Sequence, residues 1–286
     1  MPSLSYKAVF FLSDYVCLNY YSDYSAAFSV NTATTIVLVG FLVKLGAAPV
    51  HQWVVDVYAG SPMFVTSVFS TFVKFVFFML FVLVACHANC GILMDFIILA
   101  SLIVGCFMTV RQVEIKRFLA YSSIVHVGFL LMGDLVSSFI YLITYIVSSL
   151  VFFSVLMSVR VNGKELVYLN DLRLLRQSSY RNVVLLTLSL ASSAGLPPFA
   201  GFYGKYLVWV SLLEDIYLFN NFSTYLILIL SILLSLVIIF YYMRVICYLF
   251  VGDDSSINSK PVTFAKQYSS SFIYCLQVFS AGLLVL

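Results

Sequence analysis

The chain has 286 residues, of which 63% are hydrophobic and 9% are charged, and its formal net charge is +3. The mean hydropathy of +1.06 excludes an ordinary soluble domain, which needs a much larger charged share to cover its surface. Apolar runs recur at lengths near the ~20 residues that cross the hydrocarbon core, and they lack the alternation of a membrane β-barrel. The sequence therefore predicts an all-α polytopic membrane protein, because helices satisfy their own backbone groups in lipid.

The apolar runs predict about eight transmembrane helices, two of them interrupted, after a Tyr-rich surface segment at 1–25. In chain order the spans are 26–58 (interrupted), 62–86, 92–110, 117–133, 135–159, 182–213 (interrupted), 223–250 and 270–286. The longest polar connection is 160–181, and a further polar stretch follows Gly252. Both polar stretches are expected in solvent at a membrane surface.

The positive charges support this number of spans. If the spans alternate in direction, one side receives eleven of the 15 Lys and Arg residues: Arg111, Lys116, Arg117, Arg160, Lys164, Arg173, Arg176, Arg181, Arg244, Lys260 and Lys266. The opposite loops hold Asp134, Glu214 and Asp215, and Lys7 lies in the N-terminal segment. By the positive-inside rule, the basic side is the cytoplasm or the matrix, so both termini are expected on the other side.

Three lysines, Lys44, Lys74 and Lys205, lie within predicted spans. A charge at mid-membrane costs roughly 2.5–3.5 kcal/mol on insertion scales. Snorkelling to the membrane surface is the alternative for any one of them, but it suits Lys74 poorly, because apolar residues flank it deep in its span. The pKa of a buried lysine follows its neighbours, so such a lysine can hold or release a proton near neutral pH, as a relay site must.

Two of these lysines lie beside predicted helix breaks. Lys44 precedes "LGAAPVHQW", in which Gly46 and Pro49 are expected to open the helix. Lys205 follows "AGLPPFAGFYG", in which the same role is expected of Gly195, Pro197, Pro198, Gly201 and Gly204. Non-helical backbone at membrane depth is tolerated only inside protein or beside a water-filled cavity. Broken helices paired with ionisable groups are typical of transporters.

Two histidines complete the candidate proton relay. His126 lies inside a span, in "KRFLAYSSIVHVGFLLMG", between Lys74 and Lys205 in the sequence. It can carry a proton, because the unperturbed pKa of histidine is about 6.5, or it can simply bond a backbone carbonyl. His51 follows Pro49 by two residues, where it can cap the opened carbonyls or pass a proton.

Motifs for redox chemistry are missing from the sequence. It has no GxGxxG, no P-loop, no cysteine cluster for iron–sulfur and no His pair suited to haem. The chain is therefore expected to bind no metal and no cofactor of its own. It is expected to move ions with energy that comes from elsewhere.

Three stretches resemble the antiporter-like membrane subunits of respiratory complex I, NADH:ubiquinone oxidoreductase, and among these the subunit 2 family. "KLGAAPVHQWVVDVYAGSPMFVTSVFSTFVK" resembles the family's KxGxxPFHxWxPDVYxGxPxPV block, "EIKRFLAYSSIVHVGFLLMG" its KRLLAYSSIxHxGY block, and "SLASSAGLPPFAGFYGKYLV" its GxPPxxGFxxK block. The three occur in the family's order, spread over about 40–210. Val50 and Val55 stand where the family has Phe and Pro, and neither change touches an ionisable residue.

The resemblance implies that the three lysines form the central axis of a proton path, with His126 as the link between the last two. It also implies that the spans match helices seven to fourteen of the family's fold. On that match, 26–86 is the end of a first antiporter-like repeat, 92–250 is a second repeat, and 270–286 is a C-terminal transmembrane helix. The family's glutamate that tunes the first lysine has no counterpart here, so we expect a split subunit, with a separate chain carrying the missing N-terminal helices.

The function that the resemblance implies is that of a non-redox, proton-translocating subunit of the complex I membrane arm. The complex uses NADH, FMN, iron–sulfur clusters and ubiquinone, and the expected partners are neighbouring antiporter-like subunits, other membrane-arm subunits and lipids, with no nucleic acid. The expected location is the mitochondrial inner membrane, with both termini towards the intermembrane space and the Lys/Arg-rich loops in the matrix. The alternatives are a subunit of a multi-subunit cation/proton antiporter and a membrane-arm scaffold that does not pump.

Overall fold

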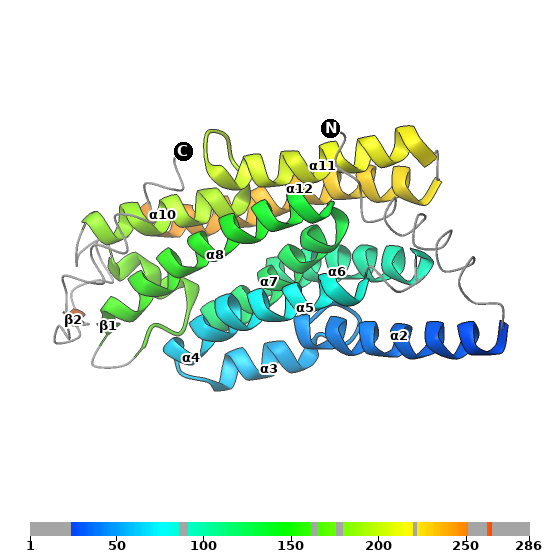
Figure 1. Cartoon of the computed structure of the whole chain (residues 1–286). Helices are drawn as coiled ribbons and strands as arrows, with labels where there is room; N and C mark the ends of the chain where they lie inside the picture. The colour runs from blue at the N-terminus through cyan, green and yellow to red at the C-terminus, as the bar shows by residue number, and fades with distance from the viewer. Residues whose placement is uncertain are drawn as a thin grey trace.

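The computed structural model describes residues 24–85, 91–161, 165–175, 180–219, 222–250 and 262–264, which form a bundle of helices (Figure 1). The surface segment predicted at 1–25 lies almost wholly outside the described residues, and so does the span predicted at 270–286. The division into two repeats stays a prediction.

The helices in chain order are α2 (Tyr24–Leu45), α3 (Gln52–Gly60), α4 (Met63–Val68), the π-helix η1 (Phe69–Val73), α5 (Lys74–Ala85), α6 (Gly91–Arg111), α7 (Ile115–Met132), α8 (Leu135–Ser158), the 3-10 helix η2 (Leu169–Leu174), α10 (Tyr180–Ala194), α11 (Ala200–Phe219) and α12 (Phe222–Phe250). Two short strands, β1 (Val159–Val161) and β2 (Val262–Phe264), pair antiparallel in the register Val159 to Phe264.

The all-α membrane class is confirmed. Among the residues that the structure describes, five helical stretches are long and apolar enough to cross a membrane: Met63–Ala85, Gly91–Arg111, Ile115–Met132, Leu135–Ser158 and Phe222–Phe250. The two spans predicted as interrupted are each split into two helices, α2 with α3 and α10 with α11. Every predicted span in the described part of the chain therefore has its helix, with bounds that differ by a few residues.

The long helices run alternately in opposite directions along the bundle (Figure 1). At one end, the first residues of α4 and α7 meet the 165–169 segment: the backbone N–H of Met63 donates to Glu165 Oε1 (3.3 Å), and that of Ile115 donates to the Val167 carbonyl (2.9 Å). Lys116 Nζ lies 2.9 Å from Glu165 Oε2 at the same end. The helices therefore alternate in direction, which is the condition under which the basic loops lie on one side of the membrane.

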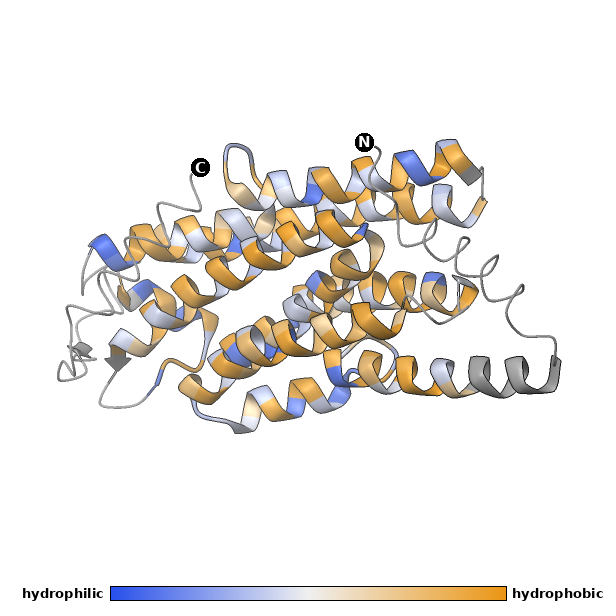
Figure 2. Cartoon of the chain, viewed as in Figure 1, coloured by the Kyte–Doolittle hydropathy of each residue, from blue (hydrophilic) through white to orange (hydrophobic). Residues whose placement is uncertain are grey.

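Helix α7 is the centre of the bundle, and most of its residues are buried. It lies very close to α6, because a Cβ added at Gly128 would meet the Ser101 hydroxyl at 2.7 Å, and one added at Gly105 would meet the Val125 side chain at 2.5 Å. The hydrophobic residues that cover the outer helices (Figure 2) include many large exposed side chains, such as those of Phe72 and Leu83. Such an apolar outer surface suits lipid, while Ser122, Ser123 and His126 of α7 are buried inside the bundle.

Candidate functional site: a buried lysine–histidine axis

The two helix breaks have the same local geometry. α2 ends before Gly46, which has φ +80°, and the N–H groups of Gly46 and Ala47 donate to the carbonyls three and five residues earlier at 3.1 Å each. α10 ends before Gly195, also at φ +80°, and Gly195 and Leu196 repeat the same two bonds at 3.0 and 3.1 Å. This is the Schellman ending of a helix, in which glycine takes the left-handed position at no steric cost.

Pro49 lies in the first break, and Pro197 and Pro198 lie in the second, as predicted. Gly201 and Gly204 do not lie in a break, which corrects their predicted role, because both belong to α11. They are small for a packing reason instead. A Cβ at Gly201 would overlap the Ser192 carbonyl, and one at Gly204 would meet the Tyr141 ring at 2.9 Å.

Lys205 points back from α11 to the end of α10. Its Nζ donates to the Ala194 carbonyl at 2.7 Å, and the side chain is 2% exposed. That carbonyl is one of those that the end of a helix leaves without an intrahelical partner. A Cβ at Gly195 would lie 2.8 Å from Lys205 Cδ, so this glycine also makes room for the lysine. The second break therefore binds its own cation.

Lys74 begins α5, directly after the π-helix η1. Its side chain is 5% exposed, and Nζ donates to the Ser123 carbonyl of α7 at 3.0 Å. The ammonium also lies 5.2 Å from the centre of the Tyr145 ring of α8, which is cation–π range. In the part of the chain that the structure describes, neither Lys74 nor Lys205 forms an ion pair with a carboxylate.

His126 lies on α7 and is 4% exposed. Nδ1 lies 2.7 Å from the hydroxyl of Tyr141, and Nε2 lies 3.3 Å from the hydroxyl of Tyr242. The Tyr145 ring packs against the imidazole, with the two ring centres 4.8 Å apart. Both ring nitrogens therefore contact hydroxyls, and the backbone carbonyl partner considered from the sequence is not the one the structure provides.

Aromatic rings lie between each of the two lysines and this histidine. Lys74 lies over the Tyr145 ring, which itself packs on His126. Lys205 Nζ lies 5.2 Å from the centre of the Phe129 ring, which packs against Tyr141 at 5.8 Å between ring centres. Lys74, His126 and Lys205 are thus all buried and are linked through aromatic rings, while their joint role in a proton path stays a prediction.

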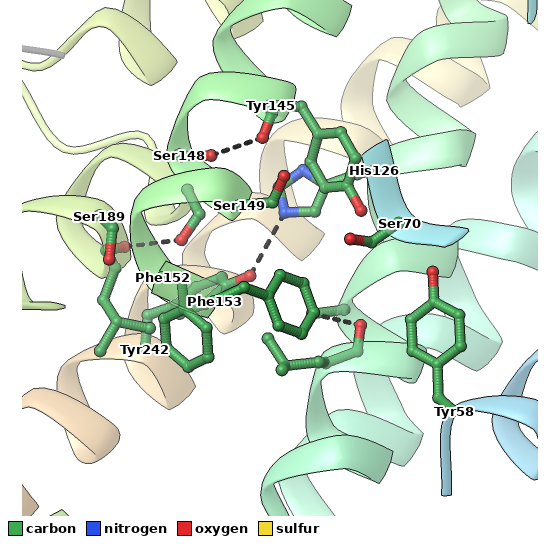
Figure 3. A pocket seen from close by; sticks show the side chains of 14 residues that line it. Tyr58, Ser70, His126, Tyr145, Ser148, Ser149, Phe152, Phe153, Ser189 and Tyr242 are labelled. Atoms are coloured by element: carbon green, nitrogen blue, oxygen red, sulfur yellow. Dashed lines mark hydrogen bonds between the residues drawn. The ribbon is translucent and has the colours of Figure 1, made fainter. Parts of the chain in front are cut away.

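A cavity adjoins His126 on the side of Tyr242 (Figure 3). Nine of its fourteen lining residues carry a hydroxyl group: Tyr58, Ser70, Ser122, Tyr145, Ser148, Ser149, Ser189, Ser193 and Tyr242. The cavity has a volume of about 30 Å³, which is room for roughly two waters. Several of these serines donate to carbonyls of their own helix, as Ser189 does to Leu186 at 2.9 Å, which leaves their oxygens able to accept a hydrogen bond from water.

Comparison with known proteins decides the family. Residues 12–235 match the family described as NADH:quinone oxidoreductase/Mrp antiporter, transmembrane. The chain belongs to this family. It is 34% identical over 239 residues to NADH-quinone oxidoreductase subunit N of Paramagnetospirillum magneticum, covering 79% of this chain and 48% of the relative. Subunit N 1 of Koribacter versatilis is 32% identical over 275 residues, with 89% and 50% covered.

Solved structures give the same grouping. A chain of respiratory complex I from Thermus thermophilus matches with a TM-score of 0.75 and 28% identity, over 88% of this chain and 55% of that one. A chain of the Mrp complex from Dietzia matches with a TM-score of 0.65 over 78% of this chain and 42% of that one, but at 17% identity it shows a likeness of fold alone. The chain spans about half the length of the curated relatives it matches.

Lys44 and His51 do not join the buried axis of this family member. Lys44 is exposed in the last turn of α2, on a stripe with the exposed Val37 and Gly40. His51 is half-buried, and its Nδ1 lies 3.0 Å from the Pro49 carbonyl, so it caps the opened backbone. Trp53 Nε1 donates to the Val43 carbonyl at 2.8 Å and closes the same break from α3.

The sequence reasoning missed the three tyrosines Tyr141, Tyr145 and Tyr242. The first two stand four residues apart in α8 and therefore on one face of it, and both are buried. That spacing was a usable signal, because a tyrosine in an apolar span needs a partner for its hydroxyl. Nothing in the local sequence pointed to Tyr242, which reaches His126 from α12.

Proposed function

We propose that this chain translocates protons as a membrane-arm subunit of an NADH:quinone oxidoreductase. The observation that carries the proposal is the burial of Lys74, His126 and Lys205, whose hydrogen-bond partners in the described part of the chain are backbone carbonyls and hydroxyls. The two ammonium groups bond backbone carbonyls, and the imidazole contacts hydroxyls. A buried lysine without a paired carboxylate can become neutral by giving up its proton, whereas an ion pair would hold it charged.

Each residue has one role in this proposal. Lys74 and Lys205 are the two proton-holding sites, and His126 passes a proton between them. The hydroxyl-lined cavity beside His126 supplies ordered water. Energy comes from NADH:quinone oxidoreduction on other subunits, which bind NADH, FMN, iron–sulfur clusters and ubiquinone, while this chain binds no redox cofactor and acts as part of the translocating enzyme.

Lys44 would be the first proton site, ahead of Lys74, and His51 a link beside it. An exposed ammonium within a span is costly towards lipid, so we propose that further transmembrane helices cover the stripe of Val37, Gly40 and Lys44. A separate chain carrying those helices, with an acidic partner for Lys44, would complete a split subunit. A mass-spectrometric inventory of the native complex tests this, because a complex without such a chain would contradict the split.

The proposed location is the mitochondrial inner membrane, with the basic end of the bundle in the matrix and both termini towards the intermembrane space. The one-sided loops with Arg111, Lys116 and Arg117 support this orientation through the positive-inside rule. The proposed partners are neighbouring antiporter-like subunits, other membrane-arm subunits and lipids. Digestion of sealed vesicles by a protease added on one side checks which loops are cleaved.

Sequence identity favours the oxidoreductase over the antiporter reading. The NADH-quinone oxidoreductase relatives are 32–34% identical, while the likeness to the Mrp complex is one of fold. Co-purification separates the two functions, because iron–sulfur and flavin subunits would accompany a complex I subunit and would not accompany a cation/proton antiporter.

Replacing Lys74 with Met tests the proton relay itself. The substitution removes the titratable group and keeps an apolar side chain of similar length in a buried position. We expect the number of protons pumped per NADH oxidised to fall sharply, on the order of tenfold, in complexes that still assemble. An unchanged ratio would favour the non-pumping scaffold.

A further inference from the structure

The contacts of His126 concern both of its ring nitrogens, and they point in two directions. Tyr242, which Nε2 contacts, lines the hydroxyl-rich cavity (Figure 3). Tyr141, which Nδ1 contacts, does not line that cavity and instead packs against Phe129 and Gly204, next to Lys205 in the chain. One nitrogen thus faces the proposed water, and the other faces the side of Lys205.

We propose that Tyr141 and Tyr242 are positioning residues for His126. They hold the imidazole with Nε2 towards the cavity and Nδ1 towards the Lys205 side. This role rests on the proposed proton translocation. It brings two more residues to the path and orients the ring so that a proton passes through His126 from the cavity to the Lys205 side.

The chemistry of the hydroxyl group explains why tyrosine suits both positions. A neutral imidazole has one N–H donor and one acceptor nitrogen, and an imidazolium has two donors. A hydroxyl can donate or accept by rotating its hydrogen, so the pair satisfies either neutral tautomer and the charged ring without moving a heavy atom. A carboxylate or an amide N–H in place of one hydroxyl would favour a single form of the ring.

The proton balance is simple in this arrangement. A protonated water in the cavity gives its excess proton to Nε2 and is left as neutral water, either directly or through the Tyr242 hydroxyl, which receives one proton as it passes on its own. The Tyr141 hydroxyl takes the Nδ1 proton as its own moves on towards the neutral amine of Lys205. One proton enters the ring and one leaves it, and no bond between heavy atoms changes.

The chain offers a matched control for this proposal. Tyr241 is adjacent to Tyr242 on α12, each is 2% exposed, and their ring centres lie 4.7 Å apart. The structure gives Tyr241 no bond to His126, whose two nitrogens contact Tyr141 and Tyr242. Tyr241→Phe therefore removes a buried hydroxyl from the same site that does not itself bond His126.

The experiment measures protons pumped per NADH oxidised in the assembled complex, reconstituted into liposomes. We expect Tyr141→Phe and Tyr242→Phe each to lower this ratio about three- to tenfold relative to Tyr241→Phe, the range of one lost hydrogen bond in a buried site. Equal ratios in all three variants would overturn the proposal, and so would a loss in only one of Tyr141→Phe and Tyr242→Phe.

A second measurement separates positioning of His126 from a general structural effect. In a His126→Gln background, the two tyrosine substitutions should cause no further fall, since residues that act through one group are non-additive. A further fall of the same size would show that the tyrosines act independently of the histidine and would overturn the proposal.

The result for Lys74→Met separates the positioning role of the two tyrosines from proton translocation by the chain. If Lys74→Met lowers the pumping ratio and the tyrosine variants match Tyr241→Phe, the positioning role fails while proton translocation stands. If Lys74→Met leaves the ratio unchanged, the proposed function itself fails.

Discussion

The two helix breaks share a turn and differ in where they place their cation. Two residues before the glycine of the turn, the first break has Lys44 and the second has Ser193. Ten residues after it, the first has Asp56 and the second has Lys205. Lys44 is exposed, whereas Lys205 is buried and bonded to the end of α10.

The difference shows which break is complete within the described chain. In the second, α11 returns over the end of α10 and supplies the ammonium that binds the Ala194 carbonyl. In the first, the neutral indole of Trp53 reaches the Val43 carbonyl, and the cation on α2 points outwards. The same turn geometry thus holds a buried cation in one place and leaves an exposed cation in the other.

The largest expected effect on stability comes from the packing of the two helices that flank each break. Six residues after the turn glycine, the second break has Gly201 and the first has the exposed Gln52. Gly201→Ala would drive a Cβ into the Ser192 carbonyl, and backbone cannot yield as a flexible side chain can. We expect about 3 kcal/mol of destabilisation or more, seen as a loss of assembled subunit on native gels.

Gln52→Ala is the matched control for that substitution. The position already carries a Cβ and is exposed, so we expect assembly within error of the parent chain. Normal assembly of Gly201→Ala would show that α10 and α11, on either side of the second break, do not pack as closely as the structure indicates.

The next effect concerns the charge of Lys205 rather than its packing. Arginine keeps a positive charge but cannot be deprotonated in proteins, so Lys205→Arg should pump as poorly as Lys205→Met, about tenfold below the parent chain. The measurement is again the number of protons pumped per NADH oxidised, in complexes matched for subunit content.

A different pattern would refute the role of proton release at Lys205. If Lys205→Arg pumped normally and only Lys205→Met failed, a fixed positive charge beside the Ala194 carbonyl would be sufficient. The second break would then be a structural ion site, and its contrast with the exposed Lys44 would concern stability alone.

The sequence predicted the helices and the breaks because both depend on local chemistry. Apolar runs of membrane length gave the spans, and Gly46 and Gly195 gave the turns, since glycine alone takes φ +80° without strain. Gly201 and Gly204 were placed wrongly because a small residue needed for close packing and one needed for a turn look the same in a sequence. That packing depends on Ser192 and Tyr141, which only the tertiary structure brings near.

The candidate site was predictable in its ions and unpredictable in their surroundings. Lys74, His126 and Lys205 stand out because ionisable residues are rare in apolar spans. Their partners are a carbonyl of Ser123, a carbonyl of Ala194 and tyrosine hydroxyls from α8 and α12. No periodicity relates these groups to the lysines, because the contacts join residues far apart in the chain. The exposure of Lys44 was also unexpected, because burial too depends on residues far apart in the chain.

The smallest effect tests the indole that closes the first break. Trp53→Phe keeps a half-buried aromatic ring and removes the N–H that binds the Val43 carbonyl at 2.8 Å. We expect a loss of about 1 kcal/mol in stability, the net value of one hydrogen bond, with the pumping ratio unchanged, because Trp53 holds no proton on the path. The thermal inactivation midpoint of the purified complex measures the first quantity. A fall in pumping without a fall in stability would mean that the first break acts on the proton path through its shape, so that the two breaks are more alike in function than their cations suggest.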